Sequence, residues 1–328
     1  MRMKAIVCTK PGPLAGLAVT EIASPAVPDD GVLVRVRDSS ANPVDLFRTS
    51  RIGNLVSWKQ RGVALGTDFA GTVEAVGKDV TEFHAGDEVF GGRWGAFAEL
   101  MCVPEKSAIV HTPTGVTSEQ AGTVAVAATT ALQALRTHGR LEAGQRLLIN
   151  GASGGVGTFA VQIACALGAD VTAVCSTRNA DMVRSLGART VIDYTREDFT
   201  RGDQRYDLIV DIAGSHSLRE CRRVMAPRGT FVGVGAAGVQ HRQGGGWRAI
   251  GHLLGTRVGS IGGSQRVVVL FIADLNKDDL AFLGEMIASG KVTPVIERRF
   301  QLSEVSSALA YMNEGHARAK VAISLASR

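Results

Sequence analysis

A glycine-rich stretch between residues 147 and 164 constrains the fold of this chain more than any other feature. Residues 147–150 read Leu-Leu-Ile-Asn, residues 151–157 read Gly-Ala-Ser-Gly-Gly-Val-Gly, and an amphipathic helical pattern follows. A buried strand, a tight turn and a helix in this order let backbone N–H groups meet a phosphate at the positive end of the helix. An ordinary glycine turn is the alternative, but a second apolar run at 171–174 completes strand–helix–strand spacing. The sequence therefore predicts a dinucleotide site.

The residues after the second apolar run indicate which dinucleotide binds. A site that prefers NAD usually has an Asp or Glu here, which holds the ribose 2′-hydroxyl. This chain has Cys175, Ser176, Thr177 and Arg178 instead. Hydroxyls and a guanidinium suit a 2′-phosphate, so we expect NADPH. The alternative is that Arg178 is only a solvated residue at the start of a helix.

Length and composition limit the classes of protein to which the chain can belong. Its 328 residues are enough for two domains, and 45% of them are hydrophobic. The formal net charge is +5, but no block of basic residues interleaved with aromatic residues occurs, so nucleic acid is not an expected partner. No apolar run is long enough to cross a membrane, and residues 1–7 have the pattern of a first strand rather than of a signal peptide.

The cysteines indicate a reducing compartment. Five of them, at positions 8, 102, 165, 175 and 221, show neither a C-x-x-C pair nor the spacing of metal ligands. An odd, scattered set in a chain of this length is typical of free thiols. We therefore expect a cytoplasmic protein.

The pattern of apolar residues changes near Ser118. Before it, short alternating runs at 31–37, 71–77, 87–90 and 96–100 predict a compact, irregular β-rich barrel. After it, residues 119–137 have a helical pattern, and buried strands then alternate with helical segments. The predicted strands cover residues 147–150, 171–174, 190–192, 208–211, 230–234 and 267–271. Six strands with helices between them predict a doubly wound parallel sheet.

The last segment, residues 292–328, is too short to form a domain of its own. It contains a strand pattern at 295–300, a helical pattern at 303–313 and a second strand pattern at 320–325. We expect it to return to the N-terminal barrel. The predicted domains are therefore residues 1–122 with 292–328, and residues 123–291, which bind the dinucleotide.

Six motifs occur in the order and with the gaps of a known family. They are Asn42–Asp45, Gly66–Gly71, Gly95–Glu99, Thr129–Leu132, Gly151–Gly157 and Glu314–Val321. Together they resemble the zinc-independent medium-chain dehydrogenases/reductases of the quinone oxidoreductase (zeta-crystallin-like) type, over nearly the whole chain. The resemblance implies an α/β fold, in which a GroES-like β-rich catalytic domain accompanies a Rossmann domain with a doubly wound, parallel, six-stranded sheet.

The resemblance also allows the metal ligands to be compared. Zinc alcohol dehydrogenases of the same superfamily hold the catalytic metal with a Cys, a His and a second Cys. The matching positions here are Asn42, Thr67 and Val126, which are not serious Zn²⁺ ligands. The four-cysteine lobe that binds their structural zinc is missing as well. We expect no metal, so the acceptor must already be electron-poor, and the protein supplies position and electrostatics.

The resemblance implies the cofactor contacts residue by residue. We expect a pyrophosphate on the turn, a 2′-phosphate after the second strand, and the nicotinamide with its ribose near Thr130. The turn residues are Ser153, Gly154, Gly155 and Val156, and those at the 2′-phosphate are Ser176, Arg178 and Tyr194. Further contacts are expected at strand ends and near the C-terminus, from Ile212, Ala213, Val234, Gly235, Phe271, His316, Ala317 and Arg318.

Asn42, Asp45 and Thr130 are the candidate catalytic residues, with Asn42 and Asp45 on the substrate side. The alternatives are that Asn42 only shapes a turn before Pro43 and that Asp45 only caps a helix. Tyr194 has the alternative of a plain aromatic residue at a sheet edge, and His316 is expected to bond or pack rather than act as an acid. The residues name no proton donor.

Three functions fit these features. The first is an NADPH-dependent oxidoreductase that transfers hydride to a quinone or another activated carbonyl compound. The second is a 2-alkenal/enone or enoyl-thioester reductase, which would share every cofactor residue. The third is a non-catalytic NADPH-binding protein. The glycine-rich segment 244–263 is expected to be either a lid or dimer contact or, as the alternative, a plain flexible excursion between two strands. The apolar edge strand at 266–271 predicts a homodimer.

Overall fold

The computed structural model of the chain describes residues 2–8, 14, 17–49, 63–235, 264–270, 272–315 and 317–325. The chain divides into two compact units: unit 1 comprises residues 1–129 and 275–328, and unit 2 comprises residues 130–274. The predicted boundaries at residues 122 and 291 differ from these. Helix α10 (Lys277–Ala288), which the prediction gave to the dinucleotide-binding domain, lies in unit 1.

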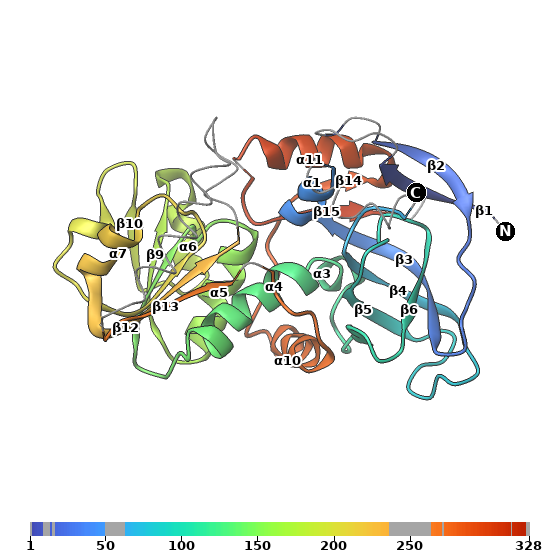
Figure 1. Cartoon of the computed structure of the whole chain (residues 1–328), viewed down its shortest axis with the longest axis horizontal. Coiled ribbons are helices and arrows are strands. Elements are labelled where there is room, and N and C mark those ends of the chain that lie inside the picture. Colours follow the sequence, from blue (N-terminus) through green and yellow to red (C-terminus); the bar gives the residue numbers. More distant parts are fainter. Residues whose placement is uncertain are drawn as a thin grey trace. The chain divides into compact units, whose positions relative to one another are not determined.

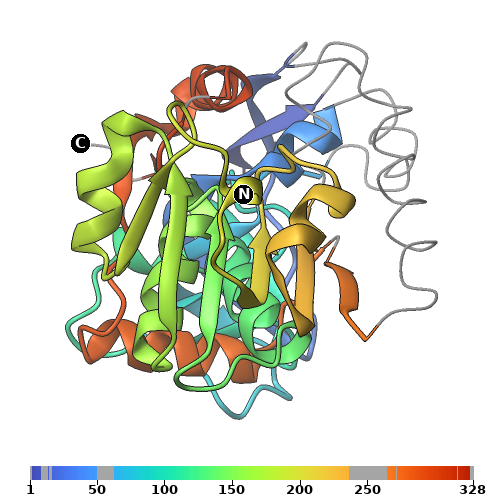
Figure 2. The same cartoon turned by 90° about the vertical axis from the view of Figure 1, so that its left-hand side faces the viewer.

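Unit 2 is built on a parallel sheet of six strands. They are β8 (Arg146–Asn150), β9 (Asp170–Cys175), β10 (Thr190–Asp193), β11 (Tyr206–Asp211), β12 (Met225–Val234) and β13 (Arg266–Leu270). Their order is β10-β9-β8-β11-β12-β13, and every neighbouring pair is parallel. Figure 2 shows these strands beside one another. This is the doubly wound order: the chain adds strands on one side of β8 as far as β10 and then continues on the other side from β11. The predicted sheet is therefore confirmed.

Helices follow the strands of unit 2 as the sequence predicts. They are α5 (Gly155–Ala166), α6 (Ala180–Ser185) and α7 (Leu218–Cys221), with short helical turns η3 (Thr177–Asn179), η4 (Phe199–Arg201) and η5 (Arg222–Val224). Helix α5 packs on β8 and β9 and buries Phe159 and Ile163 completely. Helix α6 packs on β9 and β10. Burial of these apolar side chains holds the glycine turn between β8 and α5 in place.

The helix predicted over residues 119–137 is wrong as one continuous element. The structure has α3 (Ser118–Ala121), α4 (Ala125–Leu132) and a π-helical segment, η2 (Gln133–His138). Thr117 and Gln120 form a capping box at the start of α3, and Gly122 ends it. A Cβ atom at Gly122 would lie 2.8 Å from the carbonyl oxygen of Asp38, so a close approach to the strand β3 (Gly31–Ala41) fixes the break. Because Gly122 and Asp38 are far apart in the sequence, the helical pattern of residues 119–137 could not predict this contact.

Unit 1 contains a mixed sheet of seven strands and a separate hairpin. The sheet strands are β3 (Gly31–Ala41), β4 (Asp68–Val76), β5 (Glu88–Gly92), β6 (Leu100–Pro104), β7 (Ile109–His111), β14 (Ile296–Gln301) and β15 (Lys320–Ser324). The hairpin strands are β1 (Arg2–Cys8) and β2 (Leu17–Ala23). Only the pair β14–β15 is parallel among the pairs of the sheet. The strand predicted at 96–100 is wrong in its bounds, because β6 begins at Leu100.

The C-terminal segment returns to the N-terminal part of the chain, as predicted. Strand β15 runs antiparallel to β3, with Val321 opposite Ala41. The short turn η6 (Leu302–Glu304) leads into α11 (Val305–Asn313), which packs against β14 and against helix α1 (Pro43–Thr49) (Figure 1). Segments from the C-terminal part of the chain therefore flank the end of β3 and the helix that follows it.

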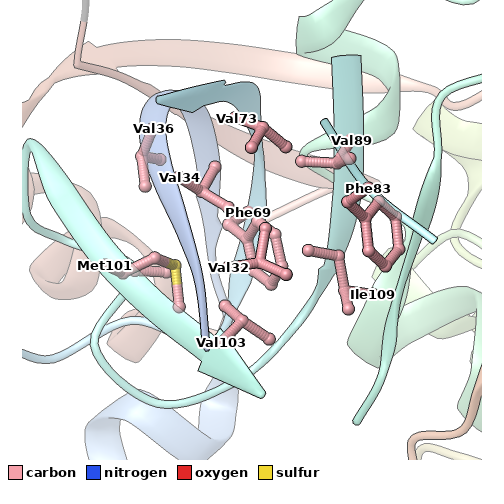
Figure 3. Close-up of a cluster of buried hydrophobic side chains, with 11 residues drawn as sticks. Val32, Val34, Val36, Phe69, Val73, Phe83, Val89, Met101, Val103 and Ile109 are labelled. Atoms are coloured by element: carbon pink, nitrogen blue, oxygen red, sulfur yellow. The ribbon is translucent and has the colours of Figure 1, made fainter. Parts of the chain in front are cut away.

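An apolar cluster fixes β3 against β4 (Figure 3). Val32, Val34 and Val36 alternate along β3 toward Phe69 and Val73, all buried. This packing sets the register that places Ser40 opposite Asp68. A slip by one residue would turn the valines to the other face, so the core also fixes which polar residues meet at the end of β3.

Candidate functional site

Buried polar side chains meet in unit 1 where three strands have their ends. Asn42 follows β3, Asp68 begins β4, and Lys320 begins β15. Their exposed fractions are 2%, 0% and 2%, respectively. Charged residues are rarely this buried unless they are paired and hydrogen-bonded.

Hydrogen bonds satisfy this buried cluster almost completely. The Lys320 ammonium donates to Asn42 Oδ1 at 2.7 Å and to Asp68 Oδ2 at 3.2 Å. The amide nitrogen of Asn42 donates to Asp68 Oδ2 at 3.0 Å and to the Ser40 carbonyl at 3.2 Å. The Ser40 hydroxyl donates to the same carboxylate, whose other oxygen accepts the N–H of Val126 in the first turn of α4 at 2.7 Å. Such bonds are what make a buried ion pair tolerable.

The network fixes the orientation of Asn42. Both amide hydrogens are donated within the network, and the amide oxygen accepts from Lys320. Asn42 therefore connects Ser40, Asp68 and Lys320 through hydrogen bonds. Its catalytic role stays a prediction. Sequence reasoning missed Lys320 and Asp68, because a lysine at a strand start and an aspartate two residues after a glycine are both typical of solvated ends.

Asp45 lies in the first turn of α1, where its carboxylate accepts the backbone N–H of Asn42 at 2.8 Å. Asp45 is the third residue of α1, so this bond is the N3 half of a capping box and differs from the N-cap bond expected as the alternative for Asp45. The side chain is fully buried, and the Thr67 hydroxyl lies 3.5 Å from its other oxygen. Burial is the main cause that raises the pKa of Asp45 to about 7, and the charge of Asp68 adds to it. The Asn42 N–H, Lys320 and Arg48 oppose this rise in pKa.

Asn42, Thr67 and Val126, which are predicted to match the zinc-ligand positions of the zinc alcohol dehydrogenases, fall within this cluster. Thr67 lies beside Asp45, and the N–H of Val126 bonds to Asp68. An amide, a hydroxyl and an aliphatic side chain do not fit Zn²⁺, which binds thiolates, imidazoles and carboxylates. Across the described ranges, no group of three or more His, Cys, Asp or Glu side chains could hold a metal ion.

The glycine turn of unit 2 has the geometry of a phosphate cradle. Gly151 has φ +91°, and a Cβ atom at Gly157 would lie 2.2 Å from the Gly151 carbonyl oxygen, so both positions require glycine. Helix α5 begins after Gly154, and no side chain caps it. Its first N–H groups, from Gly155 onward, lack intrahelical acceptors and therefore fit an anionic pyrophosphate.

The corner expected to hold the 2′-phosphate is open to solvent. Ser176 is half-buried after β9, Arg178 is exposed, and Tyr194 after β10 is 61% exposed. A carboxylate also lies here: the Thr177 hydroxyl donates to Asp193 and, as the largest cause, lowers its pKa. Ser176, Arg178 and Tyr194 can hold a phosphate only if the positive charge at this corner outweighs the negative charge of Asp193. Arg196 contributes positive charge here, with its Nε 3.6 Å from the Asp193 carboxylate.

Asn179 connects the glycine turn to this corner, and sequence reasoning missed it. Its side-chain amide donates to Ser153 Oγ at 3.0 Å and to Ser176 Oγ at 3.2 Å. The amide oxygen is buried and has no hydrogen-bond partner within the described residues. An unpartnered buried oxygen between two predicted phosphate positions fits a ligand that supplies a donor, such as a ribose hydroxyl.

The other predicted cofactor residues lie at strand ends. Ile212 and Ala213 follow β11, and their N–H groups donate to the Asn150 carbonyl. Val234 ends β12, and Gly235 follows with φ +66°. Thr130 lies within α4 and is 9% exposed. All five belong to unit 2, as the glycine turn does.

The C-terminal candidates fall in unit 1. Ala317 and Arg318 precede β15, and the Arg318 guanidinium pairs with Glu297 at 2.9 Å. The negative charge of Glu297 offsets the positive charge of the guanidinium and so weakens its attraction for a phosphate. Phe271, His316 and the segment 244–263 lie outside the described residues.

Comparisons with known proteins agree with this architecture. Two family models match the chain: an alcohol dehydrogenase GroES-like domain over residues 28–114 and a zinc-binding dehydrogenase over residues 186–323. The chain is 33% identical to the mitochondrial NAD(P)H oxidoreductase RTN4IP1 of Mus musculus, over 90% of this chain and 81% of that protein. It is 32% identical to the trans-enoyl reductase pgmF of Aspergillus terreus, over 90% and 86% of the two chains.

A solved structure extends the similarity to the whole chain. The quinone oxidoreductase from Coxiella burnetii superposes with a TM-score of 0.86 at 27% identity, covering 99% of this chain and 100% of that one. Within the described residues, no helix is long and apolar enough to cross a membrane.

The buried carboxyl group of Asp45 predicts an unusual pH dependence of stability. The folded protein keeps this proton up to about pH 7, whereas the unfolded chain loses it near pH 4. Raising the pH between these values therefore favours unfolding. Asparagine does not ionise and can still accept the Asn42 N–H. We expect Asp45→Asn to raise the free energy of unfolding at pH 8 by roughly 2 kcal/mol more than at pH 5.

Urea unfolding at the two pH values measures this difference. Asp193→Asn is the matched control, because the pKa of Asp193 is lowered and its loss should cost stability at pH 8. An Asp45→Asn variant that gains equally at both pH values, or loses stability at pH 8, would contradict the assignment.

Proposed function

We propose a specific activity for this chain, which belongs to the medium-chain dehydrogenase/reductase family and is an oxidoreductase of the quinone oxidoreductase type. The activity is the NADPH-dependent, zinc-independent reduction of a quinone or another activated carbonyl compound. The observation that carries it is that the chain contains both a phosphate cradle, in unit 2, and a buried polar cluster, in unit 1, whose residues at the predicted zinc positions do not fit Zn²⁺.

The proposal that the cofactor is NADPH rests on two predicted phosphate sites, one for the pyrophosphate and one for the 2′-phosphate. The uncapped start of α5 supports binding of the pyrophosphate by the backbone of Ser153–Val156. Ser176, Arg178 and Tyr194 are proposed to hold the 2′-phosphate, with Asn179 orienting the two serine hydroxyls. When bound, the reduced nicotinamide supplies the hydride. Thr130, Ile212, Ala213, Val234 and Gly235 are proposed as further contacts of the cofactor, as are Phe271, His316, Ala317 and Arg318.

The acceptor must be electron-poor, because the residues at the zinc positions polarise no carbonyl group as a metal would. Lys320 and Asp68 position Asn42, and the Asn42 N–H positions the carboxyl group of Asp45. A carboxyl group that stays protonated up to about pH 7 holds a proton close to the Thr67 hydroxyl. Asn42 and Asp45 are therefore proposed for the acceptor side, and Asp45 is a store for the proton that completes the reduction.

An enone or enoyl-thioester reductase is the second candidate. The observation that favours it is the trans-enoyl reductase of Aspergillus terreus, at 32% identity over 90% of this chain. Both candidates use the same cofactor residues and differ only in what accepts the hydride.

We also propose a homodimer and a cytoplasmic location. Strand β13 ends the sheet of unit 2, and Arg266–Val269 are only half-buried along it. An apolar edge strand is stabilised by a partner strand, so pairing of two copies along β13 would cover it. The five cysteines form no disulfide bond with one another, as in proteins of reducing compartments.

Removing Arg178 tests the assigned cofactor. A charge-assisted bond to the 2′-phosphate is lost in Arg178→Ala, so the dissociation constant for NADPH should rise about tenfold or more, while that for NADH changes less than about twofold. Titration of nicotinamide fluorescence measures both constants. The control is Arg184→Ala, an exposed arginine of α6 paired with Asp181 at 2.8 Å, which should leave both constants unchanged. Equal weakening of the two cofactors would refute the 2′-phosphate role of Arg178.

A panel of acceptors tests the reaction. NADPH oxidation is followed with quinones, 2-alkenals, cyclic enones and enoyl thioesters of matched size. We expect turnover of quinones to exceed that of the enones. The reverse preference would favour the second candidate, and tight NADPH binding without turnover of any acceptor would indicate a non-catalytic nucleotide-binding protein.

A further inference from the structure

Arg48 is a buried arginine whose donors are not all used. It lies in the last turn of α1 and is 7% exposed. Its guanidinium stacks over the ring of Trp94, with 4.5 Å between the guanidinium carbon and the ring centroid. The Nε and Nη1 atoms are buried and have no hydrogen-bond partner in the described part of the chain.

This arrangement is unfavourable for a group that serves only the fold. A guanidinium stays charged at every physiological pH, and each buried N–H without an acceptor weakens the folded state. Asp45, three residues earlier on the same helix, is the carboxyl group whose charge acts on Arg48. Burial keeps Asp45 protonated up to about pH 7, so it offers little negative charge in return. The described residues contain no ion pair of Arg48 with a carboxylate.

The geometry restricts what can satisfy these donors. Trp94 covers one face of the guanidinium, and the N–H groups lie in the guanidinium plane, so an acceptor for them would have to approach edge-on. The ligand must present an acceptor oxygen, and a negatively charged oxygen would balance the buried charge as well. Arg48 is also close along α1 to Asp45, which the proposed function assigns to the acceptor side.

We propose that Arg48 binds an anionic oxygen of enolate or phenolate type on a flat, conjugated acceptor. The inference rests on the proposed function and names the group that this acceptor carries. As hydride adds to the acceptor, the displaced π-electron pair moves to the acceptor oxygen and leaves it negatively charged. The guanidinium stabilises that charge until a proton from Asp45 or water neutralises it. Arg48 thereby takes the electrostatic part that a metal ion plays in the zinc alcohol dehydrogenases.

The test uses two ligands of nearly the same shape and no cofactor. 2-Hydroxy-1,4-naphthoquinone is ionised at neutral pH and carries an enolate-type oxygen, whereas 2-methoxy-1,4-naphthoquinone is neutral. Calorimetric titration gives both dissociation constants for the wild-type protein and for Arg48→Met, which keeps an unbranched chain without charge. Arg93→Met is the matched control, because Arg93 is the exposed neighbour of Trp94 and its loss changes the net charge equally.

We expect Arg48→Met to weaken binding of the hydroxy compound about tenfold or more and of the methoxy compound less than about twofold. Arg93→Met should change neither ligand by more than about twofold. The melting temperature of Arg48→Met should be unchanged or higher, because methionine removes the buried unpaired donors.

Three results would overturn the proposal. They are equal weakening of both ligands in Arg48→Met, unchanged binding of the hydroxy compound, and wild-type protein that binds the methoxy compound as tightly as the anion. The same preparations are also titrated with NADPH, which separates failure of this proposal from failure of the proposed function. Failure of the proposed function would appear as wild-type protein that neither binds NADPH nor turns over an acceptor.

Discussion

The ion pair between Lys320 and Asp68 is the contact on which the rest of unit 1 depends. It joins the start of β15 to the start of β4, and through Asn42 it reaches the end of β3 and the start of α1. Leaving one charge of a pair this deeply buried without its partner typically costs about 3–5 kcal/mol. The pair therefore fixes where Asn42, Asp45 and Thr67 lie.

The two buried cations of unit 1 differ in how they are satisfied. Lys320 donates to Asn42 and Asp68 and so has a carboxylate beside it. Arg48 stacks on Trp94 and keeps two buried donors without partners among the described residues. A satisfied charge stabilises an architecture, whereas an unsatisfied one lowers stability and can be compensated by a ligand. The same unit thus combines a fixed scaffold and a group available for binding, both within reach of Asp45.

The sequence predicts the fold of this chain well because its signals are local. Runs such as 147–150 and 171–174 are recognisable as apolar strands on either side of a helical pattern, and the order of six such strands leads directly to the doubly wound sheet. The break of the helix at Gly122 was not predictable, because its cause is the carbonyl group of Asp38 on a distant strand.

The site was predictable only in part, for a similar reason. The glycine turn and the Ser176–Arg178 corner each lie within a few consecutive residues, so a motif reveals them. Lys320 is far from Asn42 in the sequence, and only the pairing of β15 with β3 brings them together. Asn179 and Arg48 are candidates because they have buried polar atoms without hydrogen-bond partners among the described residues. Whether a single atom is buried and unpartnered cannot be predicted from a sequence pattern.

In the proposed reaction, hydride passes from NADPH to an acceptor without help from a Lewis-acid ion. Chelator-treated protein given NADPH labelled with deuterium at the transferable C4 position allows this transfer to be followed into the reduced acceptor. We expect deuterium to pass directly to the product, at a rate that added Zn²⁺ does not increase. Loss of turnover on chelation that Zn²⁺ restores, or a product without deuterium from an acceptor that is reduced at carbon, would contradict it.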